Sequence, residues 1–417
     1  MDAMNRAPSP ARRGEGALGI SRVFLIAMAL LLLCLFSAAA SAAPSLRIGV
    51  MTMAPGELFW ERFGHNALIV DDPALPEPVS YNFGSFDPGE PGFVGRFVRG
   101  EMLYALVELP TRVDLGTYRE EGRGVRIQWL DLDPAQSQAL AATLAENAKP
   151  ENARYRYDYF LDNCSTRVRD AIDKVLGGEL SRQLSAGSHG NTYRSEATRL
   201  TKPATWMWLG FDIGFGPLAD KPMSRWEEAF VPRRLADSLR EAKRADGRPL
   251  VYAEQEVLPH RVGPEPDEAP RPWWPYALTG LALAIALLWA GRRRPRLAAA
   301  FALPFWLACA LLGAVLVFLW GFTAHWAGWR NANVLLLSPL CLALVPGAWR
   351  ILRGRAPGNA FRWPLAIVAA GAALSLFVYW LPTLPQQNLR WIALLLPIHL
   401  ALLMAWWPRP TLAAAGR

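Results

Sequence analysis

The chain contains four cysteines, and their positions leave only Cys164 for chemistry outside a membrane. Cys34 lies in an N-terminal apolar segment, while Cys309 and Cys341 lie in apolar stretches long enough to cross a bilayer. If the intervening region is exported, as the N-terminus indicates below, Cys164 has no partner for an intramolecular disulfide. A thiol of this kind is buried and inert, bonded to another chain, or retained because its reactivity is needed.

The sequence after Cys164 predicts an amphipathic helix whose first turn contains the thiol. Apolar residues recur there at the spacing of one helix face: Val168, Ala171, Ile172, Val175 and Leu176. Gly177 ends this pattern, and Asp162 or Asn163 is a natural N-cap. Unpaired backbone N–H groups and the helix macrodipole favour the thiolate over the thiol at this end. The alternative is that Cys164, which lies on the inward face, is a small core residue.

A thiolate nucleophile needs a base, and we predict His65 for this role among the three histidines of the soluble region. His189 lies in a loop and His260 at the end of the region, whereas His65 begins a predicted strand, residues 65–70. Asn82 lies on the following strand, within a residue or two of the position opposite His65. Its amide could accept the imidazole N–H and fix the tautomer. Considered singly, His65 and Asn82 also fit purely structural roles.

The composition separates a membrane part from an acidic soluble part. The chain of 417 residues is 52% hydrophobic and only 19% charged, which is too apolar for an ordinary soluble enzyme. From Trp273 onward it contains 12 arginines and no Asp, Glu or Lys, whereas residues 23–272 carry a net negative charge. The formal net charge of +8 therefore comes from arginines beside membrane segments, and nothing supports nucleic-acid binding.

The N-terminus has the basic, apolar and small-residue regions of a secretory signal peptide, with cleavage after Ala42. The alternative is an uncleaved anchor. We predict the organisation from these patterns: a signal peptide at 1–42, an exported domain at 43–260, a proline-rich spacer at 261–272, five transmembrane helices at 273–407 and a cytoplasmic tail at 408–417. Ten arginines then lie in the cytoplasm, against Arg330 and Arg390 outside. His325 falls in a short outer loop, where we expect a packing or interface role.

The exported region mixes predicted strands and helices and is long enough for one domain. Strands are predicted at residues 45–52, 65–70, 79–83, 102–109 and 124–132, and a helix from Pro134 with Asp133 as its cap. We therefore predict an α+β domain followed by an all-α bundle of five transmembrane helices. The aromatic segment around Trp206 suits a lipid-facing surface, an acyl groove or an ordinary core. The region has no histidine or cysteine pair with the spacing of a metal site and no phosphate-binding glycine loop, so we expect neither a metal nor a cofactor.

Five short motifs stand out in this region, at residues 63–68, 81–87, 97–104, 121–124 and 157–170. Through these motifs, the part of the chain between about residues 45 and 240 resembles the periplasmic domain of Lnb-type bacterial lipoprotein N-acyltransferases. A strand that begins with His, a second strand with a polar residue and a later Asn-Cys also resemble the circularly permuted papain-like thiol enzymes. The resemblance implies a permuted papain-like thiol fold in the periplasm, five spans in the bacterial inner membrane and a cytoplasmic C-terminus.

The same resemblance implies an acyl transfer in which Cys164 is the nucleophile, His65 the base and Asn82 the third catalytic residue. Cys164 would attack a phospholipid acyl donor, and the N-terminal amine of a lipoprotein acceptor would then attack the acyl-thioester. We predict Asn163, Arg167 and Tyr159, which flank the thiol, as substrate-binding residues.

The two arginines after Cys164 have two possible partners. Arg167 and Arg169 could meet a phosphate, but we expect them to pair with Asp170 and Asp173 at this spacing.

Two other functions fit the sequence. One is a papain-like cysteine peptidase or amidase that acts on cell-wall peptide, which predicts a hydrophilic cleft and no need for a membrane bundle. The other is a non-catalytic, tethered envelope-binding module, which predicts that a Cys164→Ser protein works normally.

Overall fold

The computed structural model of the protein describes residues 45–268 and 272–407, together with Met28. The predicted signal peptide, apart from Met28, and the predicted tail at 408–417 lie outside the described residues.

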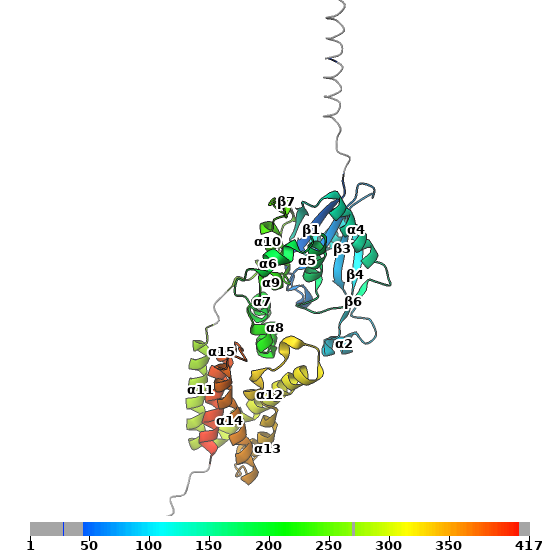
Figure 1. The fold of residues 1–417 in the computed structure, drawn as a ribbon. Helices are drawn as coiled ribbons and strands as arrows, with labels where there is room; N and C mark the ends of the chain where they lie inside the picture. The colour runs from blue at the N-terminus through cyan, green and yellow to red at the C-terminus, as the bar shows by residue number, and fades with distance from the viewer. Residues whose placement is uncertain (1–27, 29–44, 269–271, 408–417) are drawn as a thin grey trace, which may run out of the picture. The chain divides into compact units, whose positions relative to one another are not determined.

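Within the described residues, seven strands form one antiparallel sheet in the order β6-β4-β3-β2-β1-β5-β7 (Figure 1). They are β1 (Arg47–Met53), β2 (His65–Asp71), β3 (Val79–Ser85), β4 (Leu103–Pro110), β5 (Val125–Leu130), β6 (Arg154–Arg156) and β7 (Val251–Leu258). The first five lie within two residues of the predicted strands. The two edge strands were not predicted, because β6 is very short and β7 is largely exposed and carries polar residues inside the strand.

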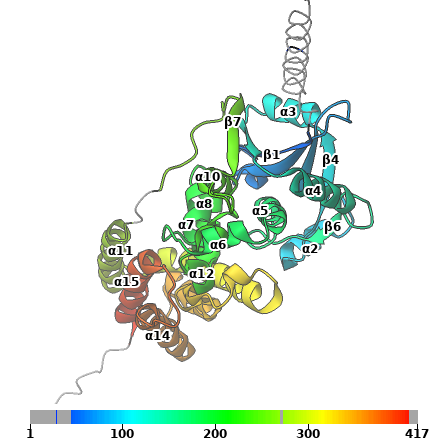
Figure 2. The same cartoon turned by 45° about the horizontal axis from the view of Figure 1, so that its top comes forward.

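Helices cover both faces of this sheet. α3 (Thr111–Glu120) lies on one face, and α4 (Pro134–Asn147) and α5 (Cys164–Val175) lie on the other (Figure 2). Because side chains alternate along a strand, Val50 belongs to the apolar core beneath α4 and α5, whereas its neighbour Met51 belongs to the core beneath α3. The sheet therefore separates two layers of buried side chains.

Six further helices belong to the soluble region. They are α2 (Phe93–Arg99), α6 (Glu179–Ser185), α7 (Tyr193–Leu200), α8 (Thr205–Gly214), α9 (Arg225–Glu228) and α10 (Pro232–Glu241). A third buried cluster, which includes Phe160, Tyr193 and Phe230, packs α7 and the end of α8 against the segment that precedes α5. The aromatic segment around Trp206 forms α8, and Trp206 itself is 68% exposed.

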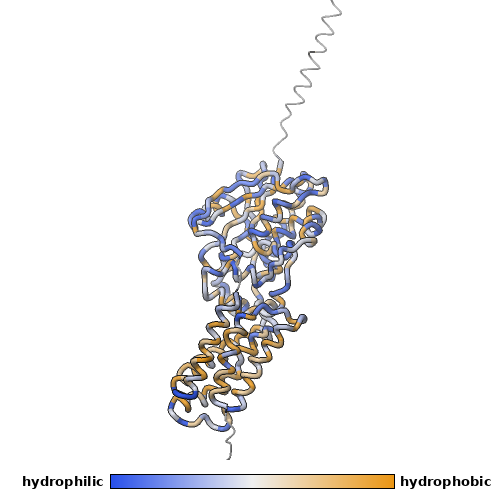
Figure 3. Tube along the Cα trace, turned by 90° about the vertical axis from the view of Figure 1, so that its left-hand side faces the viewer, coloured by the Kyte–Doolittle hydropathy of each residue, from blue (hydrophilic) through white to orange (hydrophobic). Residues whose placement is uncertain are grey.

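Within the described residues, five segments are long and apolar enough to cross a membrane (Figure 3). They are Trp274–Arg293 (α11), Pro295–Phe322 (α12), Ala332–Leu352, Asn359–Tyr379 and Leu389–Trp406 (α15). The fourth contains α14 (Arg362–Tyr379), and α11, α14 and α15 lie side by side in Figure 1. The predicted fold class, an α+β domain followed by five spans, is confirmed.

The third span differs from the continuous helix that its apolar sequence predicts. It consists of two 3₁₀ segments, η4 (Ala332–Leu335) and η5 (Pro339–Leu344), followed by α13 (Val345–Leu352). Ser338 caps η5 and Pro339 follows it, so the backbone here cannot continue an α-helical hydrogen-bond ladder. Such irregular backbone is tolerated at membrane depth only where protein surrounds it.

The predicted spacer is in contact with the soluble domain. It has no helix or strand among its described residues, yet the carboxylate of Glu265 lies 2.6 Å from Arg199 and 3.6 Å from Arg233. Glu268 pairs with Arg234. The spacer is therefore partly held along α7 and α10.

Buried polar contacts join the region around α8 to the start of the fifth span. Asp212 accepts a 2.8 Å hydrogen bond from Nε1 of Trp391 and lies 3.4 Å from the Arg390 guanidinium. Asp220 accepts a 2.7 Å hydrogen bond from Arg194 and a 3.0 Å hydrogen bond from the backbone of Gln387. All the side chains that take part are buried. Loss of one partner of a buried ion pair would leave an uncompensated charge, so these contacts tie the region around α8 to the start of the fifth span.

Candidate active site

Cys164 is the first residue of α5 and is 8% exposed. The helix begins here because Asn163 caps it: Oδ1 of Asn163 accepts a 2.9 Å hydrogen bond from the Thr166 backbone. The Asn163 amide nitrogen donates to the carbonyl oxygens of Tyr159 and Phe230, each at 2.9 Å. We predicted that Asn163 binds substrate; a contact through its amide nitrogen would have to displace one of these two hydrogen bonds. Asn163 thus positions the turn that carries the thiol.

The end of β3 lies directly beside the thiol. Gly84 has a φ of +92°, at a point where the pairing of β3 with β4 shifts register. A Cβ atom at this position would lie 3.8 Å from Cβ of Cys164 and 3.3 Å from the ring of Tyr157. Glycine therefore allows β3, α5 and the Tyr157 ring to approach one another closely.

His65 and Asn82 meet as the sequence predicts, with 3.1 Å between Nε2 of His65 and Oδ1 of Asn82. Asn82 pairs with Ala67 in the ladder, so the contact is diagonal and lies on one face of the sheet. The His65 ring also interacts with the Cys164 thiol, and each of the two groups shifts the pKa of the other. The three predicted catalytic residues are thus in a continuous chain of contacts.

Asp114 of α3 extends this chain and was not predicted. Its Oδ2 atom accepts a 2.8 Å hydrogen bond from Nδ2 of Asn82 and a 2.7 Å hydrogen bond from the Ser80 hydroxyl. A carboxylate only accepts, so it orients the NH₂ of Asn82 toward itself and the amide oxygen toward His65. Nε2 of His65 must then carry a hydrogen, which leaves Nδ1 as the basic nitrogen for the thiol.

The pairing of thiol and imidazole changes both pKa values. Burial acts to raise the pKa of Cys164, but the charge and hydrogen bond of His65, with N–H groups of Asn66 and Ser165, lower it below its ordinary value. Burial acts to lower the pKa of His65, but the Cys164 thiolate and the Asn82 amide raise it above its ordinary value. Both shifts favour a thiolate–imidazolium pair, the reactive form of a cysteine nucleophile.

Tyr155 and Tyr157 lie with Cys164 beside Gly84, and Tyr104 packs on Tyr157. Burial raises the pKa of Tyr104 to about 12 and raises the pKa values of Tyr155 and Tyr157 further. The ring centroids of Tyr104 and Tyr157 are 4.4 Å apart. These neutral phenols provide an apolar surface beside the ion pair.

The two arginines of α5 have different partners. Arg169 pairs with Asp170 at 2.7 Å, as expected. Arg167 pairs with Asp162 instead, through two hydrogen bonds of 2.5 and 2.8 Å, so the expected pairing with Asp170 or Asp173 is wrong for this residue. Because Asp162 lies in the turn before the helix, its carboxylate reaches along the first turn to Arg167.

Tyr159 connects the thiol segment to the membrane part. Its ring stacks on His325, with centroids 6.3 Å apart and planes 16° apart. Nε2 of His325 is 3.0 Å from the carbonyl oxygen of Phe97, and Nε1 of Trp326 donates a 2.9 Å hydrogen bond to Asp158. The loop between the second and third spans therefore contacts residues only a few positions before Cys164. These contacts of His325 agree with the packing or interface role that we expected for it.

The other histidines of the soluble region lie outside this chain of contacts. Nδ1 of His260 accepts a 3.1 Å hydrogen bond from the Gly124 backbone, and Nδ1 of His189 lies 2.6 Å from Glu228. Among the described residues, no group of three His, Cys, Asp or Glu side chains could hold a metal ion.

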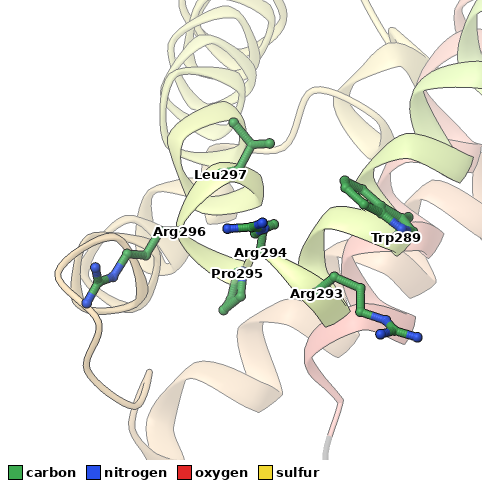
Figure 4. A pocket seen from close by; sticks show the side chains of 6 residues that line it. All are labelled: Trp289, Arg293, Arg294, Pro295, Arg296 and Leu297. Carbon is green, nitrogen blue, oxygen red and sulfur yellow. The ribbon is translucent and has the colours of Figure 1, made fainter.

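A surface pocket lies at the turn between α11 and α12 (Figure 4). Its lining consists of Trp289, Arg293, Arg294, Pro295, Arg296 and Leu297. None of the residues around Cys164 borders it, and its arginines belong to the positively charged turn of the membrane part.

Comparison with known families agrees with both parts of this architecture. The model of the Lnb N-terminal periplasmic domain matches residues 36–199, and that of the Lnb transmembrane domain matches residues 268–409. Curated proteins and solved structures gave no match. The two ranges together span more than half of the chain and contain His65, Asn82, Cys164 and all five spans. The chain therefore belongs to the Lnb family and is a membrane protein with a periplasmic domain.

Proposed function

We propose that this protein is a thiol acyltransferase that moves an acyl chain from a phospholipid to the N-terminal amine of a lipoprotein. The observation that carries the proposal is the contact chain Cys164, His65, Asn82 and Asp114, in which a thiol at a helix N-terminus faces an imidazole of defined tautomer. Nucleophile, base and orienting group are the parts that covalent acyl transfer requires.

In the first half-reaction the Cys164 thiolate attacks the carbonyl carbon of a phospholipid ester. The C–S bond forms and the ester C–O bond breaks, while the imidazolium of His65 gives its proton to the departing lysophospholipid oxygen. Backbone N–H groups at the start of α5 stabilise the oxyanion of the tetrahedral intermediate. The products are the acyl-thioester of Cys164 and a lysophospholipid.

In the second half-reaction the free amine of the lipoprotein attacks the thioester carbonyl. The C–N bond forms, the C–S bond breaks, and neutral His65 takes the proton that the amine loses. The thiolate–imidazolium pair is restored, so the cycle needs no oxidant, reductant or metal.

The membrane part supports this choice of substrates over a peptide of the cell wall. Phospholipids and lipoproteins are both confined to the bilayer, and a site fixed to membrane spans meets them at high effective concentration. In the proposed topology the soluble domain is periplasmic and the arginine-rich turns and C-terminus lie in the cytoplasm, in an inner membrane. Asn163 positions the thiol, and Arg167 and Tyr159 border the path of the substrates.

The proposal is tested by the mass of a lipoprotein N-terminal lipopeptide from a host depleted of its own N-acyltransferase. The host expresses either this protein or its Cys164→Ala form, at membrane levels shown to be equal. We expect one added acyl chain with the natural protein and none with Cys164→Ala. If neither protein adds a chain, the acyltransferase proposal fails and a thiol peptidase or a binding module takes its place. If both add a chain, Cys164 is not the nucleophile.

A further inference from the structure

A run of exposed apolar side chains lies immediately before His65. Leu58, Phe59 and Trp60 are 51%, 43% and 47% exposed, although they are consecutive and large. Their backbone forms the 3₁₀ turn η1 (Phe59–Glu61), which Glu61 stabilises through a 3.2 Å hydrogen bond from the Leu58 backbone. A fixed, clustered apolar surface of this kind is uncommon on a soluble domain and marks a binding surface.

These rings are the outer part of a continuous aromatic row, which we name the ring row. It contains Trp206, Phe59, Trp60, Phe86, Tyr104 and Tyr157, and successive centroids are 6.5, 4.7, 6.1, 4.9 and 4.4 Å apart. Every step lies within the range of direct aromatic contact. The inner end is Tyr157, whose ring and Cys164 both approach Gly84.

The outer end of the ring row is close to the membrane part. Trp208, two residues after Trp206 on α8, lies with its ring 5.8 Å from the Arg390 guanidinium. Asp212 on the same helix binds Trp391. Arg390 and Trp391 are at the first turn of the fifth span, so α8 packs against the start of that span. The outer end of the ring row therefore belongs to a helix that contacts the membrane part, and the inner end lies beside the thiol.

We propose that the ring row binds the acyl chain of the donor phospholipid, with the ester carbonyl at Cys164 and the chain directed toward Trp206. This inference rests on the proposed acyl transfer and names the binding site for its donor. The donor is the occupant because its reactive carbonyl is the first carbon of the chain, so the chain must leave from Cys164. In the lipoprotein acceptor the reactive atom is an amine, and its own chains need not pass the thiol.

The site is tested first by photo-cross-linking, which needs no turnover. Full-length Cys164→Ala protein in nanodiscs receives phosphatidylethanolamine with a diazirine in the middle of one acyl chain, and labelled peptides are mapped by mass spectrometry. We expect label on the peptides that contain residues 58–60 and Trp206. In Phe59→Ser/Trp60→Ser the label at Trp206 falls about fivefold or more, whereas Leu75→Ser, an exposed apolar control at 45% exposure, leaves it unchanged. Label confined to the spans, or unaffected by the double change, overturns the site.

A second measurement separates chain binding from simple contact with the bilayer. Protein with intact Cys164, in detergent, is given p-nitrophenyl esters of a long and a short acid. Each methylene bound along the ring row is expected to favour the long ester about fourfold. The ratio of long-ester to short-ester rates falls about tenfold in Phe59→Ser/Trp60→Ser and is unchanged in Leu75→Ser. An unaltered ratio in the double variant means that the rings only rest in the bilayer, and overturns the inference.

The two measurements also distinguish this inference from the acyltransferase proposal. Cross-linking as expected, without any ester cleavage that depends on Cys164, leaves the acyl site standing and removes the proposed chemistry. Ester cleavage that depends on Cys164, without label on the ring row, leaves the proposed chemistry standing and removes the acyl site.

Discussion

The side-chain nitrogen of Asn82 donates a 2.8 Å hydrogen bond to the buried carboxylate of Asp114. This bond determines which end of the amide faces His65, and so which imidazole nitrogen is left for Cys164. In the proposed mechanism Asp114 is thus a positioning residue, which acts on Cys164 through Asn82 and His65.

Asp114→Asn replaces the acceptor with an amide of the same shape. The amide at 114 no longer fixes the orientation of Asn82, and the wrong His65 tautomer becomes populated. We expect kcat for acylation to fall about 10- to 100-fold, the size of one lost charged hydrogen bond, with KM nearly unchanged. Stopped-flow measurement of the alcohol released from an ester substrate gives kcat and KM separately. Asp246→Asn, a change at an exposed turn, is the matched control, and an unchanged kcat in Asp114→Asn contradicts the positioning role.

Asn82→Ala tests the other side of the same contact through the pH profile. The hydrogen bond from Nε2 of His65 to Asn82 favours the imidazolium, so its loss lowers the pKa of His65. The ion pair forms as pH rises through the pKa of Cys164 and is lost as pH rises through the pKa of His65. The alkaline limb of kcat/KM should therefore move to lower pH in Asn82→Ala. A limb that stays in place, or moves upward, shows that His65 does not produce it.

Trp326→Phe tests the contact between the membrane part and the thiol segment. The change removes the hydrogen bond to Asp158 and keeps an aromatic ring among Phe160 and Tyr193. We expect the acylation rate to fall about threefold to tenfold at equal protein level, because the segment before Cys164 loses a fixed contact. The control is Trp329→Phe, whose indole N–H donates instead to the carbonyl oxygen of Thr323. Equal rates in the two variants mean that the loop serves packing alone.

Gly84→Ala tests the close approach of β3 to the thiol. Alanine at a positive φ costs about 1 kcal/mol or more, and here its Cβ also meets the Tyr157 ring and Cys164. Gly177→Ala carries the same backbone cost, at a φ of +65°, but its Cβ meets nothing within 4 Å. Both variants should lower the Tm in detergent, while only Gly84→Ala lowers the acylation rate. A similar loss of rate in both variants assigns the effect to stability.

The local elements of the site follow from the sequence because neighbouring residues determine them. The helix that begins at Cys164 has a clear N-cap, and its apolar residues recur at helical spacing. The strands that contain His65 and Asn82 are short stretches of apolar residues or of alternating apolar and polar residues. α3 was missed because its ten residues contain few apolar side chains. The sequence around Asp114 therefore has no apolar periodicity that predicts its burial.

Contacts between distant segments could not be predicted from one sequence. Tyr159 and His325 stack although more than 160 residues separate them in the sequence. No local sequence feature of either residue predicts its contact with the other. The polar interface of Asp212 with Trp391 is of the same kind. Arg167 was assigned the wrong partner because helical spacing favours Asp170, three residues further on, whereas Asp162 reaches it from the preceding turn.

The central claim is that Cys164 carries an acyl chain, and the mass of the protein itself tests it most directly. Full-length protein in nanodiscs of one synthetic phospholipid, without a lipoprotein acceptor, is analysed after brief incubation by mass spectrometry of the peptide that contains Cys164. We expect that peptide to gain the mass of one acyl chain of that lipid, to lose it in hydroxylamine, and to remain unmodified in His65→Ala. A Cys164 peptide that never gains an acyl chain, while acceptor lipoproteins are still acylated, contradicts the account.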